Sequence, residues 1–243
     1  MTAVAVAMAI LGGLTAGHLV ALFGDALYTG APLERPEVCG RRAAGADFLP
    51  YWRCAVRREG CSLPSRWYLL PALTAAWWGA AAARTSAPDG PAHFVLLAWA
   101  GTILLALSTT DLERHRIPNR VVYPAIAAGI ALSWAWPDRG WANTLLAGVL
   151  GLALLLVPAL VVPSGLGLGD VKLSALIGLL CGLKSLVVAL TTGVVAGAVG
   201  ALVVLIVRRD RKALMPYGPF LAAGALFALL WGARLYDWYV GGR

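Results

Sequence analysis

Charge is scarce in this chain. Only 13% of its 243 residues are charged, whereas 60% are hydrophobic. Soluble proteins carry roughly 25% charged and 45–50% apolar residues, and a soluble domain could not bury this much apolar surface. The composition excludes a soluble globular domain and predicts an integral membrane protein with several spans. The 28 glycines suit close helix–helix contact in lipid.

Two other signals are missing. The net charge is +8, yet no basic segment is interleaved with aromatic residues as single-stranded nucleic acid requires, so we expect no nucleic-acid partner. The first apolar stretch lacks a basic segment before it and exceeds the about 7–15 apolar residues of a signal peptide. We therefore interpret it as a membrane helix. The chain also shows no internal repeat.

Hydropathy predicts an all-α polytopic membrane protein with about eight transmembrane helices and one cytoplasmic loop after the first helix. Several segments are shorter than the about 20 residues of a full span. The division between the sixth and seventh segments, around residues 182–184, is the weakest boundary. The predicted segments are 3–23, 67–84, 92–110, 121–136, 142–163, 170–183, 185–207 and 216–234.

The basic residues predict the orientation. The loops near 24–66, 111–120, 164–172 and 208–215 hold 15 of the 20 Lys and Arg residues, and the alternate loops and termini hold 5. Because Lys and Arg concentrate in cytoplasmic loops, the first set should be cytoplasmic and both termini should lie outside. If the sixth and seventh segments were one helix, the last loop would change sides and this bias would weaken.

Asp111 follows a long apolar run and opens the polar stretch Asp-Leu-Glu-Arg-His-Arg-Ile-Pro-Asn. Pro118 ends any helix there because proline lacks an N–H donor and restricts its predecessor. Asp111 is either an ordinary acid in a cytoplasmic loop or a functional carboxylate, since idle charge near the membrane is costly.

Asp170 ends the run Gly-Leu-Gly-Leu-Gly-Asp, in which three glycines precede the acid. Glycine allows close approach of another chain to the backbone. Asp170 could serve as the N-cap of the next helix, as a functional acid, or as both. Two such carboxylates can share one proton and activate a water molecule, as in aspartic proteases.

Together, Asp111-Leu-x4-Ile117-Pro118-Asn119 and Gly167-Leu-Gly169-Asp170-Val-Lys172-Leu resemble the prepilin peptidases, which are intramembrane aspartyl proteases of the GxGD type. The resemblance is strongest over about residues 92–190 and implies that Asp111 and Asp170 are catalytic. We expect the other motif residues to bind substrate or shape the site, and they are Gly167, Gly169, Lys172, Pro118 and Asn119. The Lys172 side chain would either hold a carboxylate ionised or reach lipid headgroups.

The resemblance also implies a substrate and a location. Family members cleave the short basic leader of prepilins or pseudopilins, in type IV pilus or secretion systems, at the cytoplasmic face of the inner membrane. The implied partners are such a substrate and membrane lipid. We divide the chain into 1–66, the first helix with a cysteine-containing loop, and 67–243, the transmembrane aspartic peptidase domain.

The loop cysteines depart from the family pattern. Family members often carry two Cys-x-x-Cys pairs there, whereas this chain has only Cys39, Cys54 and Cys61. Structural zinc takes four ligands, so we do not expect zinc. The peptidase reaction needs no cofactor. N-methylation of the product with S-adenosylmethionine, which many family members perform, stays open because the amino-terminal motifs have also diverged.

Two other classes of function remain as alternatives. A proton-coupled transporter or channel could use Asp111 and Asp170 as relay groups, since paired intramembrane acids serve that role too. A catalytically silent pilus or secretion assembly factor could keep the same fold. The intact aspartate pair argues against the silent factor, and the missing repeat argues against the transporter.

Overall fold

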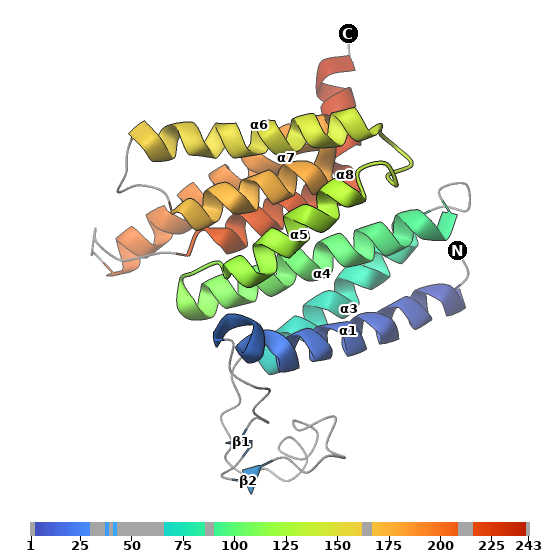
Figure 1. Ribbon diagram of the computed structural model, residues 1–243, viewed down its shortest axis with the longest axis vertical. Coiled ribbons are helices and arrows are strands. Elements are labelled where there is room, and N and C mark those ends of the chain that lie inside the picture. The colour runs from blue at the N-terminus through green and yellow to red at the C-terminus, as the bar shows by residue number, and fades with distance from the viewer. Residues whose placement is uncertain are drawn as a thin grey trace.

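The computed structural model describes residues 3–29, 37–38, 41–42, 66–85, 90–161, 167–208 and 216–241, and it is a bundle of long helices (Figure 1). Two short strands pair antiparallel, with Glu37 opposite Arg42. The elements are α1 (Ala3–Thr29), β1 (Glu37–Val38), β2 (Arg41–Arg42), α3 (Arg66–Arg84), α4 (Gly90–Arg114), α5 (Asn119–Ala131), α6 (Trp141–Val161), α7 (Leu168–Arg208) and α8 (Gly218–Gly241).

The predicted class, an all-α polytopic membrane protein, is confirmed. Five helices among the described residues are long and apolar enough to cross a membrane, namely α1, α4, α6, α7 and α8. Helix α5 has 13 residues, so at 1.5 Å per residue it is about 20 Å long. That is less than the about 30 Å thickness of the hydrocarbon core. This segment therefore crosses only part of a membrane by itself.

Helix α7 is two helices joined at Gly182, whose φ of 71° and ψ of 172° are not helical. Only glycine adopts such backbone angles easily. Figure 1 shows the two halves running in opposite directions, so the chain turns back at this residue. The predicted separation of the sixth and seventh segments is thus confirmed, and counting the halves of α7 separately gives eight helical segments in the described chain.

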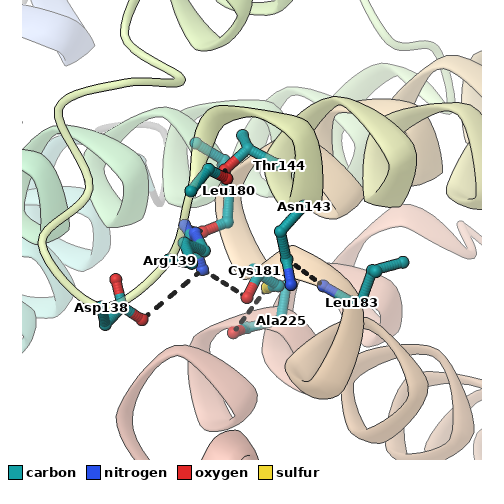
Figure 2. A network of polar contacts seen from close by, with 9 residues as sticks. Asp138, Arg139, Asn143, Thr144, Leu180, Cys181, Leu183 and Ala225 are labelled. Carbon is teal, nitrogen blue, oxygen red and sulfur yellow. Dashed lines mark hydrogen bonds and ion pairs between the residues drawn. The ribbon is translucent and has the colours of Figure 1, made fainter.

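Side chains from the α5–α6 connection and from α6 hold this turn together (Figure 2). The two terminal nitrogens of Arg139 donate to the backbone carbonyls of Leu180 and Cys181, at the end of the first half. The Asn143 Oδ1 atom accepts the N–H of Leu183 at 3.0 Å, at the start of the second half. Backbone groups that a helix end leaves without partners are therefore satisfied on both sides of the turn.

The helix ends sort into two groups. The ends of α1, α4 and α6 and the starts of α3, α5, α7 and α8 gather at one end of the bundle (Figure 1). The start of α1, the turn at Gly182 and the end of α8 lie toward the other end. This arrangement agrees with the alternation of loops predicted from the sequence, and it brings Asp111 and Asp170 to the same end.

Small residues let the helices approach closely. A Cβ atom on Gly17 of α1 would overlap Thr74 of α3, and one on Gly178 of α7 would overlap the backbone of Ala147 in α6. The Thr74 hydroxyl also donates to the Gly13 carbonyl at 2.8 Å. This confirms the expectation that glycine serves helix contact in this chain.

Candidate active site

Asp111 is the buried acid of the last turn of α4. The predicted apolar segment ends at residue 110, but the helix continues to Arg114. It stops at His115, whose φ of 52° is left-handed. Leu112, Glu113 and Arg114 are exposed, whereas Asp111 is only 5% exposed. Asp111 therefore faces the bundle interior, and the interpretation as an ordinary loop acid is wrong.

The partner of Asp111 is the start of α8. The backbone N–H of Gly218 donates to Asp111 Oδ2 at 2.9 Å. This N–H is one of those that a helix N-terminus leaves without an intrahelical acceptor, and the positive end of the helix dipole favours a carboxylate there. A Cβ atom on Gly218 would lie 2.6 Å from the same oxygen. Only glycine thus lets the backbone reach this acid.

Asp170 lies in the first turn of α7, which begins at Leu168. The expectation that Asp170 is the N-cap is therefore wrong, because the helix starts two residues earlier. Gly167 accepts the backbone N–H of Asp170 at 3.0 Å, which closes this turn. The Asp170 side chain is half-buried and carries its negative charge at a helix N-terminus, where it is favourable.

The two carboxylates lie near each other, with Asp170 within electrostatic reach of Asp111. Tyr217, next to Gly218 in the chain, is also near Asp170, because burial and then the charge of Asp170 raise the pKa of the Tyr217 phenol. One short turn therefore contacts Asp111 through Gly218 and approaches Asp170 through Tyr217, although the two acids are far apart in sequence.

The other predicted site residues converge on the same place. Gly169 lies against Ile117, since a Cβ atom on this glycine would be 3.3 Å from Ile117 Cβ. Pro118 occupies the N-cap position of α5 with extended backbone angles. The segment before Asp170 thus rests on the segment that follows Asp111.

Lys172 joins these two segments. Its Nζ atom donates to Asn119 Oδ1 at 2.9 Å and lies 4.8 Å from the centre of the Tyr123 ring. The side chain is engaged by α5 rather than by a carboxylate, and its expected contact with headgroups stays a prediction. The lysine connects the start of α7 to the start of α5.

An apolar cavity of about 220 Å³ lies between α1, α3, α4 and the start of α5. Leu107 and Thr110 line it from α4, and Pro118 and Val121 line it from the start of α5. Neither Asp111 nor Asp170 is among its described lining residues. The cavity offers space for an apolar chain between the helix that carries Asp111 and the segment that follows it.

The prediction on zinc is not tested by the structure. Cys39, Cys54 and Cys61 lie outside the described residues. Within the described part of the chain, no three His, Cys, Asp or Glu side chains are grouped so that they could hold a metal. Cys181 is buried in the core with a free thiol, 3.8 Å from the carbonyl of Ala225, as expected for a residue that serves packing.

Tyr217 and Gly218 are the site residues that the sequence did not indicate to us. A signal was present in Pro216-Tyr217-Gly218-Pro219, immediately before the last apolar run. Two prolines around a glycine mark a turn at a helix start. That turn lies at the same end of the bundle as both aspartates.

Comparison with known proteins agrees with this geometry. The model of the type IV leader peptidase family matches residues 96–202, which include both aspartates. The prepilin leader peptidase/N-methyltransferase of Bacillus subtilis is 34% identical over 143 residues, covering 57% of this chain and 56% of that protein. The Aeromonas hydrophila protein of the same name is 29% identical over 192 residues, covering 76% of this chain and 65% of that protein.

A third relative with this name, from Pseudomonas putida, is 28% identical over 216 residues, covering 84% of this chain and 74% of that protein. The chain spans less than two thirds of the length of the Bacillus and Aeromonas hydrophila relatives. No solved structure matches it. The family model and these relatives show that the chain is similar to the type IV leader peptidase family over the segment that holds both aspartates.

Proposed function

We propose that this protein is a membrane-embedded aspartic endopeptidase that removes the short basic leader from prepilin-like or pseudopilin-like substrates. The observation that carries the proposal is the proximity of Asp111 and Asp170 at one end of the bundle, where Asp111 also accepts the N–H of Gly218. The curated relatives carry the name of this activity, which favours it over a proton relay or a silent assembly factor.

The mechanism follows from two like charges in close proximity. Such a pair shares one proton, and its titration belongs to the pair rather than to either residue. The ionised carboxylate takes a proton from a water molecule, whose oxygen attacks the carbonyl carbon of the scissile peptide. The neutral carboxyl group protonates the carbonyl oxygen as the tetrahedral intermediate forms.

Collapse of the intermediate completes the cleavage. The C–N bond breaks and the departing nitrogen takes the proton that the first carboxylate received from water. The other carboxylate recovers a proton from the hydroxyl of the intermediate, so the pair again holds one proton. Atoms and charge balance, and no metal or organic cofactor enters a step.

The substrate would lie with its leader at the membrane surface and its apolar helix in the membrane. The apolar cavity between α4, which carries Asp111, and the start of α5 supports this placement. The bias of 15 Lys and Arg residues toward the aspartate end supports a cytoplasmic site in the inner membrane. The division into 1–66 and 67–243 stays a prediction.

The test is cleavage of a prepilin-like substrate by membranes that hold the wild-type chain, Asp111→Asn, Asp170→Asn or a control, Asp237→Asn. Asp237 lies near the other end of α8 and is an exposed acid. We expect both site variants to lose at least about 100-fold in rate, the low end of what general acid–base catalysis contributes. The control should cleave normally. Undiminished cleavage by either site variant would refute the dyad.

The same membranes test the two accessory predictions. Labelled S-adenosylmethionine reports whether the released product is methylated, and metal analysis of the purified protein reports zinc. Neither result affects the assignment of the peptidase, because the proposed steps use only water and the two carboxylates.

A further inference from the structure

A second cavity lies at the opposite end of the bundle from the aspartates, and the proposed peptidase reaction does not use it. Its volume is about 190 Å³, and α3, α4, α7, α8 and the α5–α6 connection all line it. Three arginines line it, Arg84, Arg139 and Arg234, and among the described lining residues Asp138 is the single acid. The cavity is therefore cationic.

Arg139 is the buried residue of this cavity. Its side chain is only 8% exposed, and its guanidinium carbon lies 3.9 Å from the centre of the Trp136 ring. Burial lowers the pKa of Arg139, while Asp138 and Cys181 oppose that effect. An arginine stays cationic nonetheless. Asp138 Oδ2 is 4.0 Å away on a carboxylate that is half exposed, so the buried positive charge is only partly compensated.

Three buried nitrogens in the cavity wall have no hydrogen-bond partner within the described chain. They are Arg139 Nε, Trp136 Nε1 and His93 Nδ1. The terminal nitrogens of Arg139 are already engaged by the backbone at the turn of α7 (Figure 2). Indole and guanidinium nitrogens can only donate, and native proteins rarely leave buried donors unsatisfied. The described residues of this wall thus leave these nitrogens without an acceptor.

The remaining arginines extend the same surface. Arg84 donates from Nε and Nη2 to the Leu230 carbonyl at 3.1 and 2.9 Å, which leaves Nη1 for another acceptor. Arg234 is exposed at the rim. Next to them, the rings of Phe227 and Trp231 stack at 5.4 Å, with 41% and 44% of these residues exposed. An apolar surface therefore adjoins the cationic cavity.

We propose that this cavity binds the phosphate group in the headgroup of an anionic phospholipid. A phosphate diester supplies acceptor oxygens for the unsatisfied donors and negative charge for the arginines, and arginine suits phosphate geometry. Basic pockets between membrane helices take such headgroups on the cytoplasmic side, and we extend the same chemistry to this end of the bundle. The exposed Phe227 and Trp231 would lie along an acyl chain. Free phosphate shares the headgroup chemistry but gains nothing from the aromatic surface.

The test is native mass spectrometry of the full chain released from detergent, with added phosphatidylglycerol, phosphatidylcholine or inorganic phosphate. Three variants are compared with wild type: Arg234→Gln, the double variant Arg84→Gln/Arg234→Gln, and the control Lys184→Gln. Lys184 lies at the same end of the bundle, is exposed and pairs with Asp237, and it does not line the cavity. Thermal unfolding of each variant confirms that it is folded.

We expect wild type to retain one phosphatidylglycerol in preference to phosphatidylcholine. Retention should fall about fivefold in Arg234→Gln and at least tenfold in the double variant. The reason is that each arginine near a headgroup contributes about fivefold to the affinity. The control should match wild type. Retention of inorganic phosphate with the same dependence on the arginines would support the site with a soluble anion as its ligand. Equal retention by all variants, or an equal loss in Lys184→Gln, would overturn the proposal.

Discussion

The two ends of the bundle each bury a charge and treat it differently. At one end, Asp111 accepts a backbone N–H from the start of α8 and lies near a second acid, Asp170. At the other end, Arg139 donates to the carbonyls of Leu180 and Cys181, where the first half of α7 stops. Both charges thus use helix ends as partners, and each has the sign that the helix dipole favours.

The two ends differ in how the contacts of the buried charge affect stability. Arg139 gives two of its nitrogens to the backbone and thereby holds a turn, so its main effect should be on stability. The two aspartates repel each other, although Asp111 accepts the backbone N–H of Gly218. This repulsion is unfavourable for stability and useful for moving a proton. Substitutions at the two ends should therefore separate activity from stability.

Beyond the aspartates themselves, the largest effect should come from Gly218→Ala. Its Cβ atom would lie 2.6 Å from Asp111 Oδ2 and 3.1 Å from Cγ, so the carboxylate must move away from the position that the N–H of residue 218 defines. Misplacement of a reacting group by about 1 Å can cost about 100-fold in rate. We expect cleavage of a prepilin-like substrate to fall by that order, with little change in the unfolding temperature.

Gly241→Ala is the matched control, because it lies at the other end of α8 and a Cβ atom there would meet nothing within 4 Å. It should cleave like wild type. If Gly218→Ala retained wild-type cleavage, the close approach of α8 to Asp111 would have no part in the reaction.

The second effect is on stability. Arg139→Gln removes the buried cation and leaves the carbonyls of Leu180 and Cys181 without their donors. An unsatisfied buried group costs about 1–3 kcal/mol, so we expect a loss of about 3 kcal/mol in the free energy of unfolding. Reversible unfolding in mixed micelles measures it. Cleavage per folded molecule should change by less than about twofold, and a loss as large as that of Gly218→Ala would contradict the separation of the two ends.

Most of the fold could be predicted from the sequence because lipid imposes long apolar segments. Even the turn at Gly182 was predictable, since Gly182-Leu183-Lys184 interrupts an otherwise apolar stretch. The ends of the helices were harder to predict. Helix α4 runs on to Arg114 and α8 to Gly241, beyond the predicted 110 and 234, because polar residues on the exposed face do not stop a helix.

The site was predictable where side chains carry its chemistry and not where the backbone does. Asp111 and Asp170 stand out as charges near apolar runs, and the structure brings them together. The donor from Gly218 is a main-chain N–H, and nothing in a glycine indicates which acid will accept it. In the sequence, Arg139 is likewise only one basic residue of a short loop, because its burial depends on α7 folding back.

A smaller effect is expected at the turn itself. Gly182→Ala would force a φ of 71° on a residue with a Cβ atom, which would lie 2.7 Å from Arg139 Cδ. Such backbone strain costs about 1–3 kcal/mol, so the loss should be below that of Arg139→Gln. Gly140→Ala is the control, since a Cβ atom there meets nothing within 4 Å. Equal unfolding free energies for the two alanine variants would show that the turn tolerates a side chain.

The smallest effect should come from Lys172, which lies at the aspartate end but bonds Asn119 rather than either acid. Its Nζ atom bonds Asn119 at 2.9 Å and lies over Tyr123. A double-mutant cycle with Lys172→Met and Asn119→Ala should give a coupling of about 0.5–1 kcal/mol in unfolding free energy, because the pair is partly solvated. Cleavage should fall only a few-fold in either variant. A loss comparable to that of Asp170→Asn would instead make Lys172 part of the chemistry.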